Sequence, residues 1–303
     1  MDWKSRRITA LLEAALIEDK AANDVTTALT IDPNMRATAT IVAKQSCVVA
    51  GIGCISAFLS LYGKLSTKPS NSSVRFEVVS HPEIFDGVRV KKGQAIAVIR
   101  ANAASILSTE RVILNLMQRM SGIATLTNEY VAEAAKAKSP SRIQTKILDT
   151  RKTIPGLRIL DKYAVRCGGG ENHRLDLSDG ILIKNNHIAL GGGIEKVLAR
   201  AKERRKGSQV IDIEVRNLAE LELALDHGAE SLLLDNMTPA EVKKSVEFVR
   251  KRGLAIPIEA SGGITLENIR KYALAGPDYI SVGALTHSAP AVDLSMRITA
   301  EIY

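Results

Sequence analysis

From about residue 140 to residue 288, short apolar runs alternate with segments whose apolar residues recur at helical spacing. The apolar runs are residues 143–148, 180–183, 210–215, 231–234, 256–259 and 279–282. The helical segments between the later runs are residues 193–205, 218–228, 239–253 and 266–275. Repeated strand–helix units form parallel sheets or barrels with the helices outside. The alternation therefore predicts an α/β fold with parallel strands over this part of the chain.

The N-terminal part has a different pattern. It predicts helices over residues 5–19 and 52–62, strands over 36–43 and 74–79, and a strand–turn–strand unit over 87–99. A long helical pattern over residues 105–138 leads out of this region, and Pro140 marks its end. We therefore expect an α+β domain with its linking helix over residues 1–139 and an α/β domain over 140–288. Residues 289–303 are expected to form a C-terminal helix that packs back on the first domain.

Composition excludes several classes of protein. A chain of 303 residues with 46% hydrophobic residues has enough apolar side chains for one large and one smaller core. Its three cysteines lack the CxxC spacing of structural zinc sites and are an odd number, which argues against a disulfide framework. Residues 1–20 carry charges throughout, unlike a secretory signal, and no apolar run approaches the roughly 20 residues of a membrane span. We expect a cytoplasmic protein without membrane contacts.

The net charge of +8 raises the question of nucleic-acid binding. The densest basic runs, residues 202–206 and 250–252, lie near the ends of predicted helices, where cations interact favourably with the helix dipole. Aromatic residues are only 4% of the chain, so stacking platforms for bases are scarce. We expect no nucleic-acid partner.

Positive charges follow two of the predicted strands. Arg151 and Lys152 come soon after the run 143–148, and Lys184 directly follows the run 180–183. The C-terminal ends of parallel strands are where α/β enzymes hold their active sites. The sequence therefore predicts an anion site at this edge of the sheet.

Arginines suggest what kind of anion is bound. The guanidinium groups of Arg151, Arg174 and Arg111 match planar carboxylates through paired hydrogen bonds, although any one of them is equally well explained by a structural ion pair. Two such groups suit a small acid with more than one carboxylate. His173 stands beside Arg174 and after Gly168–Gly170, a position that favours a substrate donor over a core histidine.

Two acids also end predicted strands, Glu214 and Asp235. Carboxylates in such positions bind Mg²⁺ or ribose hydroxyls, or they form salt bridges to Lys152 or Lys184. A Mg²⁺ site with so few protein carboxylates would take its remaining ligands from phosphate oxygens and water. These acids therefore point to a phosphorylated cosubstrate.

Glycine-containing turns follow the last two predicted strands. They are Ser261–Gly262–Gly263 and Ser281–Val282–Gly283–Ala284. The last two loops of such barrels commonly hold phosphate through backbone N–H groups, and glycine lets the backbone approach closely. The Walker and GxGxxG patterns are absent, which argues against nucleoside triphosphatase and dinucleotide sites.

Together these segments resemble the quinolinate phosphoribosyltransferases. The resemblance rests on TERVILNLMQRMSGIAT, DTRKTIPGLRILDKYAV, GGGENHR, ILIKNNHI, IEVRNL, LLLDNM, EASGGI and SVGALTHS, which run in family order from about Thr109 to Ser288. The segments EDKAANDVTT and GIGC extend it over nearly the whole chain. DTRKTIPGLR combined with GGGENHR is the most specific part.

The resemblance implies a mixed α+β N-terminal domain followed by an incomplete α/β barrel. It also implies transfer of phosphoribosyl from phosphoribosyl pyrophosphate to quinolinate with decarboxylation, Mg²⁺ as the metal, and no organic cofactor. The family's dimers place an N-terminal arginine in the partner's site, a role that falls on Arg111 here, and a higher oligomer is compatible with this. The other implied roles fall on Arg151, His173 and Arg174 for the dicarboxylate, Lys152 and Lys184 between the two substrates, Glu214 and Asp235 for ribose or Mg²⁺, and Ser261, Gly262, Gly263, Val282, Gly283 and Ala284 for phosphate. Thr150 is expected to bind substrate, and Lys152, Lys184, Glu214 and Asp235 are the expected catalytic residues.

Asn185 departs from the family pattern, which usually has an acidic residue between the lysine and the asparagine of KNNH. Lys184, Asn186 and His187 are kept, so we expect the chemistry to survive. Three other functions stay open at this point. They are a phosphoribosyltransferase for another pyridine or aromatic acid, a barrel lyase that uses Lys184 or Lys152 as a Schiff base, and an RNA-binding protein.

Overall fold

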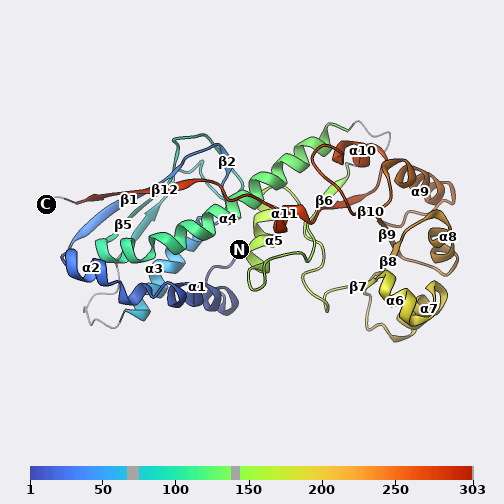
Figure 1. Cartoon of the computed structure of the whole chain (residues 1–303), viewed down its shortest axis with the longest axis horizontal. Helices are drawn as coiled ribbons and strands as arrows, with labels where there is room; N and C mark the ends of the chain where they lie inside the picture. Colours follow the sequence, from blue (N-terminus) through green and yellow to red (C-terminus); the bar gives the residue numbers. More distant parts are fainter. Residues whose placement is uncertain (67–74, 138–143, 302–303) are drawn as a thin grey trace. The chain divides into compact units, whose positions relative to one another are not determined.

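A computed structural model describes residues 1–66, 75–137 and 144–301 (Figure 1). The chain divides into two compact units. Unit 1 comprises Met1–Leu126, Ile154–Gly169 and Ala289–Tyr303, and unit 2 comprises Thr127–Thr153 and Gly170–Ser288.

Unit 1 is built on a four-stranded sheet in the order β12-β1-β5-β3, with antiparallel pairs. Its strands are β1 (Arg36–Ala43), β2 (Cys47–Val48), β3 (Glu77–Val79), β4 (Arg89–Val90), β5 (Ala95–Asn102) and β12 (Leu294–Ala300), of which β2 and β4 pair separately. Its helices are α1 (Arg6–Glu18), η1 (Ala21–Asn23), α2 (Val25–Thr30), α3 (Gly53–Leu65), the first part of α4 (Ala103–Ala135) and α5 (Arg158–Cys167).

Alternating burial explains the central strand of this sheet. Along β1 the first residues alternate between half-buried and buried, which is the period of a strand with one face on a core. Helix α1 buries Ile8, Leu12 and Leu16, which are spaced four apart and so lie on one helical face. Figure 1 shows α1, α3 and the first part of α4 along one side of the sheet.

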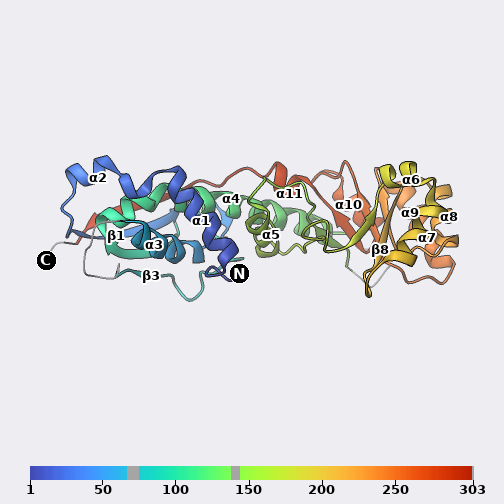
Figure 2. The same cartoon turned by 90° about the horizontal axis from the view of Figure 1, so that it is seen from below.

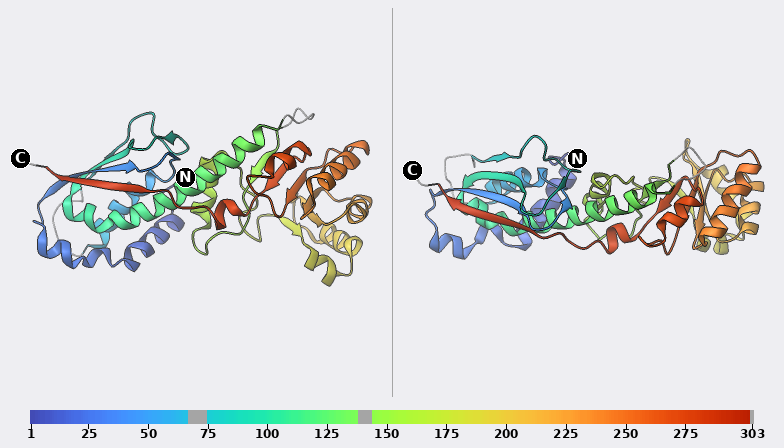
Figure 3. Two further views of the ribbon diagram at one scale, coloured as in Figure 1. Left: turned by 45° about the horizontal axis from the view of Figure 1, so that its top comes forward. Right: turned by 90° about the horizontal axis from the view of Figure 1, so that it is seen from above.

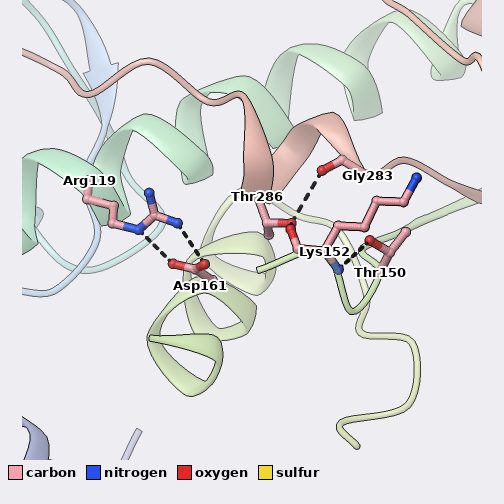
Figure 4. A network of polar contacts seen from close by, with 6 residues as sticks. All are labelled: Arg119, Thr150, Lys152, Asp161, Gly283 and Thr286. Carbon is pink, nitrogen blue, oxygen red and sulfur yellow. Dashed lines mark hydrogen bonds and ion pairs between the residues drawn. The ribbon is translucent and has the colours of Figure 1, made fainter. Parts of the chain in front are cut away.

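Helix α5 is fixed to unit 1 by polar contacts. Asp161 is fully buried and receives two hydrogen bonds from the Arg119 guanidinium, at 2.9 and 2.7 Å (Figure 4). The hydroxyl of Tyr163 donates to Asp86 at 2.5 Å. These contacts explain why residues 154–169 group with unit 1, although the sequence pattern placed them within residues 140–288.

The prediction of a helix over residues 289–303 is wrong. Residues Leu294–Ala300 form strand β12, which pairs with β1 from Ala43↔Leu294 to Ala37↔Ala300. The free edge of β1 offers a row of backbone donors and acceptors, and the β-branched pair Ile298 and Thr299 favours the extended conformation. The sequence of residues 289–303 carries no information about that edge, which exists only in the folded sheet.

Unit 2 contains a six-stranded parallel sheet in the order β6-β11-β10-β9-β8-β7. The strands are β6 (Lys146–Leu148), β7 (Ile181–Ile183), β8 (Ile211–Val215), β9 (Ser231–Asp235), β10 (Ile258–Ser261) and β11 (Tyr279–Ser281). The helices are α6 (Asn185–Gly191), α7 (Ile194–Arg204), α8 (Leu218–Asp226), α9 (Pro239–Lys251), α10 (Ile269–Leu274) and α11 (Ala284–His287). Figures 2 and 3 show α7, α8 and α9, in yellow to orange, on the outer side of the strands.

The parallel sheet forms an incomplete barrel, as expected. Strands β7 and β6 stand at the two ends of the strand order, and the edge of β6 is extended by a bridge between Leu148 and Glu171. Along β8, Ile211, Ile213 and Val215 are buried while Asp212 and Glu214 are half-buried, so the polar side chains share the opposite face. This alternation delivers acids to the inside of the barrel.

The strand–helix alternation predicted for the α/β part is confirmed by these elements. Some predicted positions lie outside the described residues. They are Lys138 at the end of the predicted linking helix, the boundary at Pro140, the starts of two predicted strands at Val74 and Ile143, and the last two residues of the segment 289–303. Within residues 1–66, 75–137 and 144–301, every helix is too short or too polar to cross a bilayer.

Candidate active site

A cavity of about 570 Å³ lies in unit 2, where the parallel strands end. This volume falls within the range of small-molecule sites. The cavity is lined by Thr150, Arg151, Lys152, His173, Arg174, Leu182, Lys184, Glu214, Leu233, Asp235, Glu259, Ser261, Gly262, Gly263, Ile264, Thr265, Ser281, Val282, Gly283, Ala284 and His287. The structure therefore brings together every predicted site residue except Arg111.

Two neighbouring guanidinium groups, those of Arg151 and Arg174, lie in the cavity lining. Arg174 donates from Nη1 to the Gly180 carbonyl at 3.0 Å, and burial together with the charge of Arg151 lowers the pKa of its guanidinium. The Nε of Arg151 is buried and has no hydrogen-bond partner among the described residues. Two like charges close together and an unused buried donor are the features of a site that receives an anion.

The buried carboxylate of Asp149 brings these arginines together. It accepts the His173 backbone N–H at 2.9 Å and the Asn172 amide at 2.6 Å. Glu171, which precedes Asn172, donates its backbone N–H to the Ile147 carbonyl and accepts the backbone N–H of Asp149. Because Asp149 directly follows β6 and lies two residues before Arg151, this anchoring places the segment carrying His173 and Arg174 beside Arg151.

Lys152 lies in a closely packed turn, shown in Figure 4. Its backbone N–H donates to the Thr150 hydroxyl at 3.0 Å, and its carbonyl accepts from the Thr286 hydroxyl at 2.8 Å. A Cβ on Gly283 would meet the Lys152 Cδ at 3.0 Å and the His287 ring at 3.2 Å. Glycine at position 283 therefore lets the last predicted loop approach the lysine side chain.

The cavity lining also contains two neighbouring acids, Glu214 and Asp235. Burial and the charge of Asp235 raise the pKa of Glu214, and the nearby Lys184 opposes this rise. Asn185 donates from its amide to Glu214 Oε1 at 2.7 Å. An acid at position 185 would instead repel Glu214, so the amide removes one unfavourable contact. The Glu214–Asp235 pair offers hard oxygen ligands, although no group of three or more His, Cys, Asp or Glu suited to a metal occurs among the described residues.

The turn after β10 needs its glycines for conformation. Gly262 has a φ of +94° and Gly263 a φ of +63°, in the region that disfavours other residues. Asn236, which packs against Gly262, has a φ of +54° and donates its backbone N–H to the Ser261 carbonyl at 2.8 Å. The turn is thus held in one shape against the loop that follows Asp235.

Arg111 belongs to unit 1, where it is an exposed residue of α4, whereas the residues that line the cavity belong to unit 2. Its predicted role in a partner subunit's site stays a prediction. Six lining residues escaped the sequence analysis: Leu182, Leu233, Glu259, Ile264, Thr265 and His287. The first three stand two positions before Lys184, Asp235 and Ser261, so the period of a strand could have found them.

Comparisons with known proteins agree with this fold. The family profiles for the quinolinate phosphoribosyl transferase N-terminal and C-terminal domains match residues 24–121 and 123–297. Over 293 residues the chain is 39% identical to a probable nicotinate-nucleotide pyrophosphorylase (carboxylating) of Bacillus subtilis, covering 97% of this chain and 94% of that protein. A protein with the same description from Methanocaldococcus jannaschii is 40% identical over 95% of this chain and 96% of its own length.

Solved structures give the same result. The crystal structure of NadC from Streptococcus pyogenes superposes with a TM-score of 0.88 at 34% identity, and the match covers 100% of both chains. The nicotinate-nucleotide pyrophosphorylase of Ehrlichia chaffeensis gives a TM-score of 0.83 at 35% identity, over 96% of this chain and 98% of that one. With both domain profiles matched in order and the fold shared throughout, the chain belongs to the quinolinate phosphoribosyl transferase family.

Proposed function

We propose that the protein transfers phosphoribosyl from phosphoribosyl pyrophosphate to quinolinate, with loss of CO₂, in the synthesis of NAD. The products are nicotinate mononucleotide, pyrophosphate and CO₂. The names of its relatives give this activity. The observation that carries the proposal is the cavity at the strand ends, whose lining contains both a pair of neighbouring guanidinium groups and a pair of neighbouring carboxyl groups.

The guanidinium pair suits the dicarboxylate. Arg151 has an open buried donor, and Arg174 stands next to it, so the two can each hold one carboxylate. Thr150 and His173, the neighbours of Arg151 and Arg174 in the sequence, also line the cavity. In this proposal Arg111 of a partner subunit completes the dicarboxylate site, so the active unit is a homodimer. We also propose that the protein is cytoplasmic.

The glycine turns and the acids suit the phosphoribosyl donor. Backbone N–H groups of residues 261–263 and 282–284 would bind phosphate oxygens, and Lys152 and Lys184 would lie between the two substrates. Glu214 and Asp235 provide two oxygen donors, which fits a Mg²⁺ ion whose other ligands come from phosphate and water. Bound Mg²⁺ would neutralise charge on the pyrophosphate leaving group. No organic cofactor is needed.

The chemistry follows from how the residues hold the two substrates. The ring nitrogen of quinolinate donates its electron pair to C1 of the ribose, and the C1–O bond to pyrophosphate breaks. Positive charge grows on the ribose in this step, so a carboxylate of Glu214 or Asp235 stabilises the transition state more than the ground state. Orientation of two repelling anions supplies roughly 7–11 kcal/mol of the barrier reduction in well-aligned systems.

Decarboxylation needs no further group on the protein. Once the ring nitrogen is bonded to ribose it is cationic, and the C2–carboxylate bond breaks with its electron pair staying on C2. The neighbouring positive nitrogen stabilises that pair, and a proton then adds to C2. The arginines release the C2 carboxylate as neutral CO₂, which no longer binds them.

Incubation of the protein with quinolinate, phosphoribosyl pyrophosphate and Mg²⁺ tests the proposal. Nicotinate mononucleotide, pyrophosphate and CO₂ should appear in equal amounts. A second assay replaces quinolinate with nicotinate. A phosphoribosyltransferase for another pyridine acid of this kind would form a mononucleotide from nicotinate without releasing CO₂, whereas the proposed enzyme requires quinolinate. Absence of nicotinate mononucleotide from the complete mixture, with a folded protein, would refute the proposal.

A further inference from the structure

Glu259 is a buried acid of the cavity to which the proposed reaction assigns no role. It lies in β10 two residues before Ser261, so both side chains face the inside of the barrel. The residue is 9% exposed, and its Oε1 is buried without a hydrogen-bond partner among the described residues. A buried carboxylate beside an anion site is unfavourable for binding the anion, so its presence calls for an explanation.

The other oxygen of Glu259 holds His173. Nε2 of the imidazole lies 3.3 Å from Glu259 Oε2, and Nδ1 accepts the backbone N–H of Arg174 at 2.7 Å. Because Nδ1 is an acceptor here, the ring carries its proton on Nε2, directed at the carboxylate. With the backbone N–H of His173 donating to Asp149, residue 173 is fixed from β6 on one side and from β10 on the other.

His173 is next in the chain to Arg174, whose guanidinium must point toward the substrate. The His173 ring hydrogen-bonds to the backbone of Arg174, and the Arg174 side chain continues to the Gly180 carbonyl. The charge of Arg151 repels the Arg174 guanidinium and favours its turning away. A well-held backbone at residues 173–174 opposes that movement.

We propose that Glu259 is a positioning residue that acts through His173 to hold Arg174 in the direction needed for a carboxylate of the substrate. This inference rests on the proposed function, because quinolinate is the ligand that the arginine pair receives. Glu259 then affects binding of the dicarboxylate and leaves binding of the phosphoribosyl donor unchanged.

The direction in which the affinity for quinolinate changes on replacing Glu259 distinguishes a positioning role from a purely electrostatic effect of its charge. Removing a negative charge near an anion site should by itself strengthen binding of the anion. Removing the acceptor that holds His173 should weaken binding, because Arg174 loses its orientation. Glu259→Gln removes the charge but keeps an oxygen that can accept from Nε2–H, whereas Glu259→Leu removes both in a side chain of similar size.

Titration calorimetry of quinolinate into the purified protein is the test. We expect Glu259→Leu to raise the Kd of quinolinate at least about tenfold, the size of one lost hydrogen bond to a charged group. Glu259→Gln should restore the Kd to within about threefold of the unaltered protein, because the hydrogen bond survives. The KM of phosphoribosyl pyrophosphate should stay the same in both variants, which a general loss of structure would not allow.

A second comparison keeps the proposal falsifiable if Glu259→Leu is unstable. His173→Ala alone should weaken quinolinate binding, and adding Glu259→Gln or Glu259→Leu should produce no further weakening, because the positioning role passes through His173. Tighter binding in Glu259→Leu, or additive losses in the double variants, would overturn the proposal. Failure of the unaltered protein to bind or convert quinolinate would instead overturn the proposed function, and this inference with it.

Discussion

Gly262 offers a sharp test of how the turn after β10 is built. A Cβ at this position would lie 2.2 Å from Oδ1 and 2.6 Å from Cγ of Asn236, and 3.0 Å from the Asn236 backbone nitrogen. The neighbouring Gly263 has a similar positive φ, yet a Cβ there would meet nothing within 4 Å. The two glycines are therefore a matched pair that share a backbone constraint and differ in the space around them.

The expected cost of each alanine follows from these numbers. A left-handed conformation costs an alanine about 1–2 kcal/mol, which applies to both positions. Gly262→Ala must also displace the Asn236 side chain, and forced repacking of this kind adds about 1–3 kcal/mol. We expect Gly263→Ala to lower the free energy of unfolding by about 1–2 kcal/mol and Gly262→Ala by about 2–5 kcal/mol.

Urea denaturation of the two variants measures this difference, and a suppressor checks its cause. Asn236 has a φ of +54°, so glycine is well suited to that position, and Asn236→Gly would remove the atoms nearest to the new Cβ. The double variant Gly262→Ala with Asn236→Gly should recover most of the repacking cost and keep the conformational cost. Equal destabilisation by the two single variants, or no recovery in the double variant, would refute the reasoning.

Three further predictions concern the reaction. Arg151→Ala and Arg174→Ala should each raise the KM of quinolinate about 10–100-fold in steady-state assays, the size of a lost charge-assisted hydrogen bond, and an unchanged KM would remove their role. Glu214→Gln should lower kcat more than it changes quinolinate affinity, because its charge matters most when the ribose becomes positive; equal effects on both would contradict this. Arg111→Ala and Lys184→Ala proteins, each inactive alone, should regain part of the activity when their subunits are exchanged, because a mixed dimer contains one intact site; no recovery after verified exchange would exclude a shared site.

The parts of the site that the sequence predicts are those tied to a local rule. Lys184, Glu214 and Asp235 stand at strand ends, and parallel strands bring their ends to one edge whatever the rest of the chain does. Strand β12 was missed because its pairing partner lies more than 250 residues away, and the open edge of β1 is a property of the folded sheet. The same reason hides the role of Asp149, whose two acceptor contacts come from residues 172 and 173.

The fixed charges of the cavity show why arrangement matters more here than total charge. Four lysine and arginine side chains face three carboxylates, since Glu259 joins the two acids found from the sequence. Net attraction for an anion is therefore small, and a uniformly mixed pocket of this composition would bind two anionic substrates poorly. The structure instead groups the charges locally. Arg151 and Arg174 are neighbours, with Glu259 held against His173, and Glu214 and Asp235 are neighbours, with Lys184 beside them. The arginine pair can hold carboxylates of the substrate. The Glu214–Asp235 pair favours the positive charge that the ribose develops as its C1–O bond breaks during transfer of phosphoribosyl to a pyridine acid.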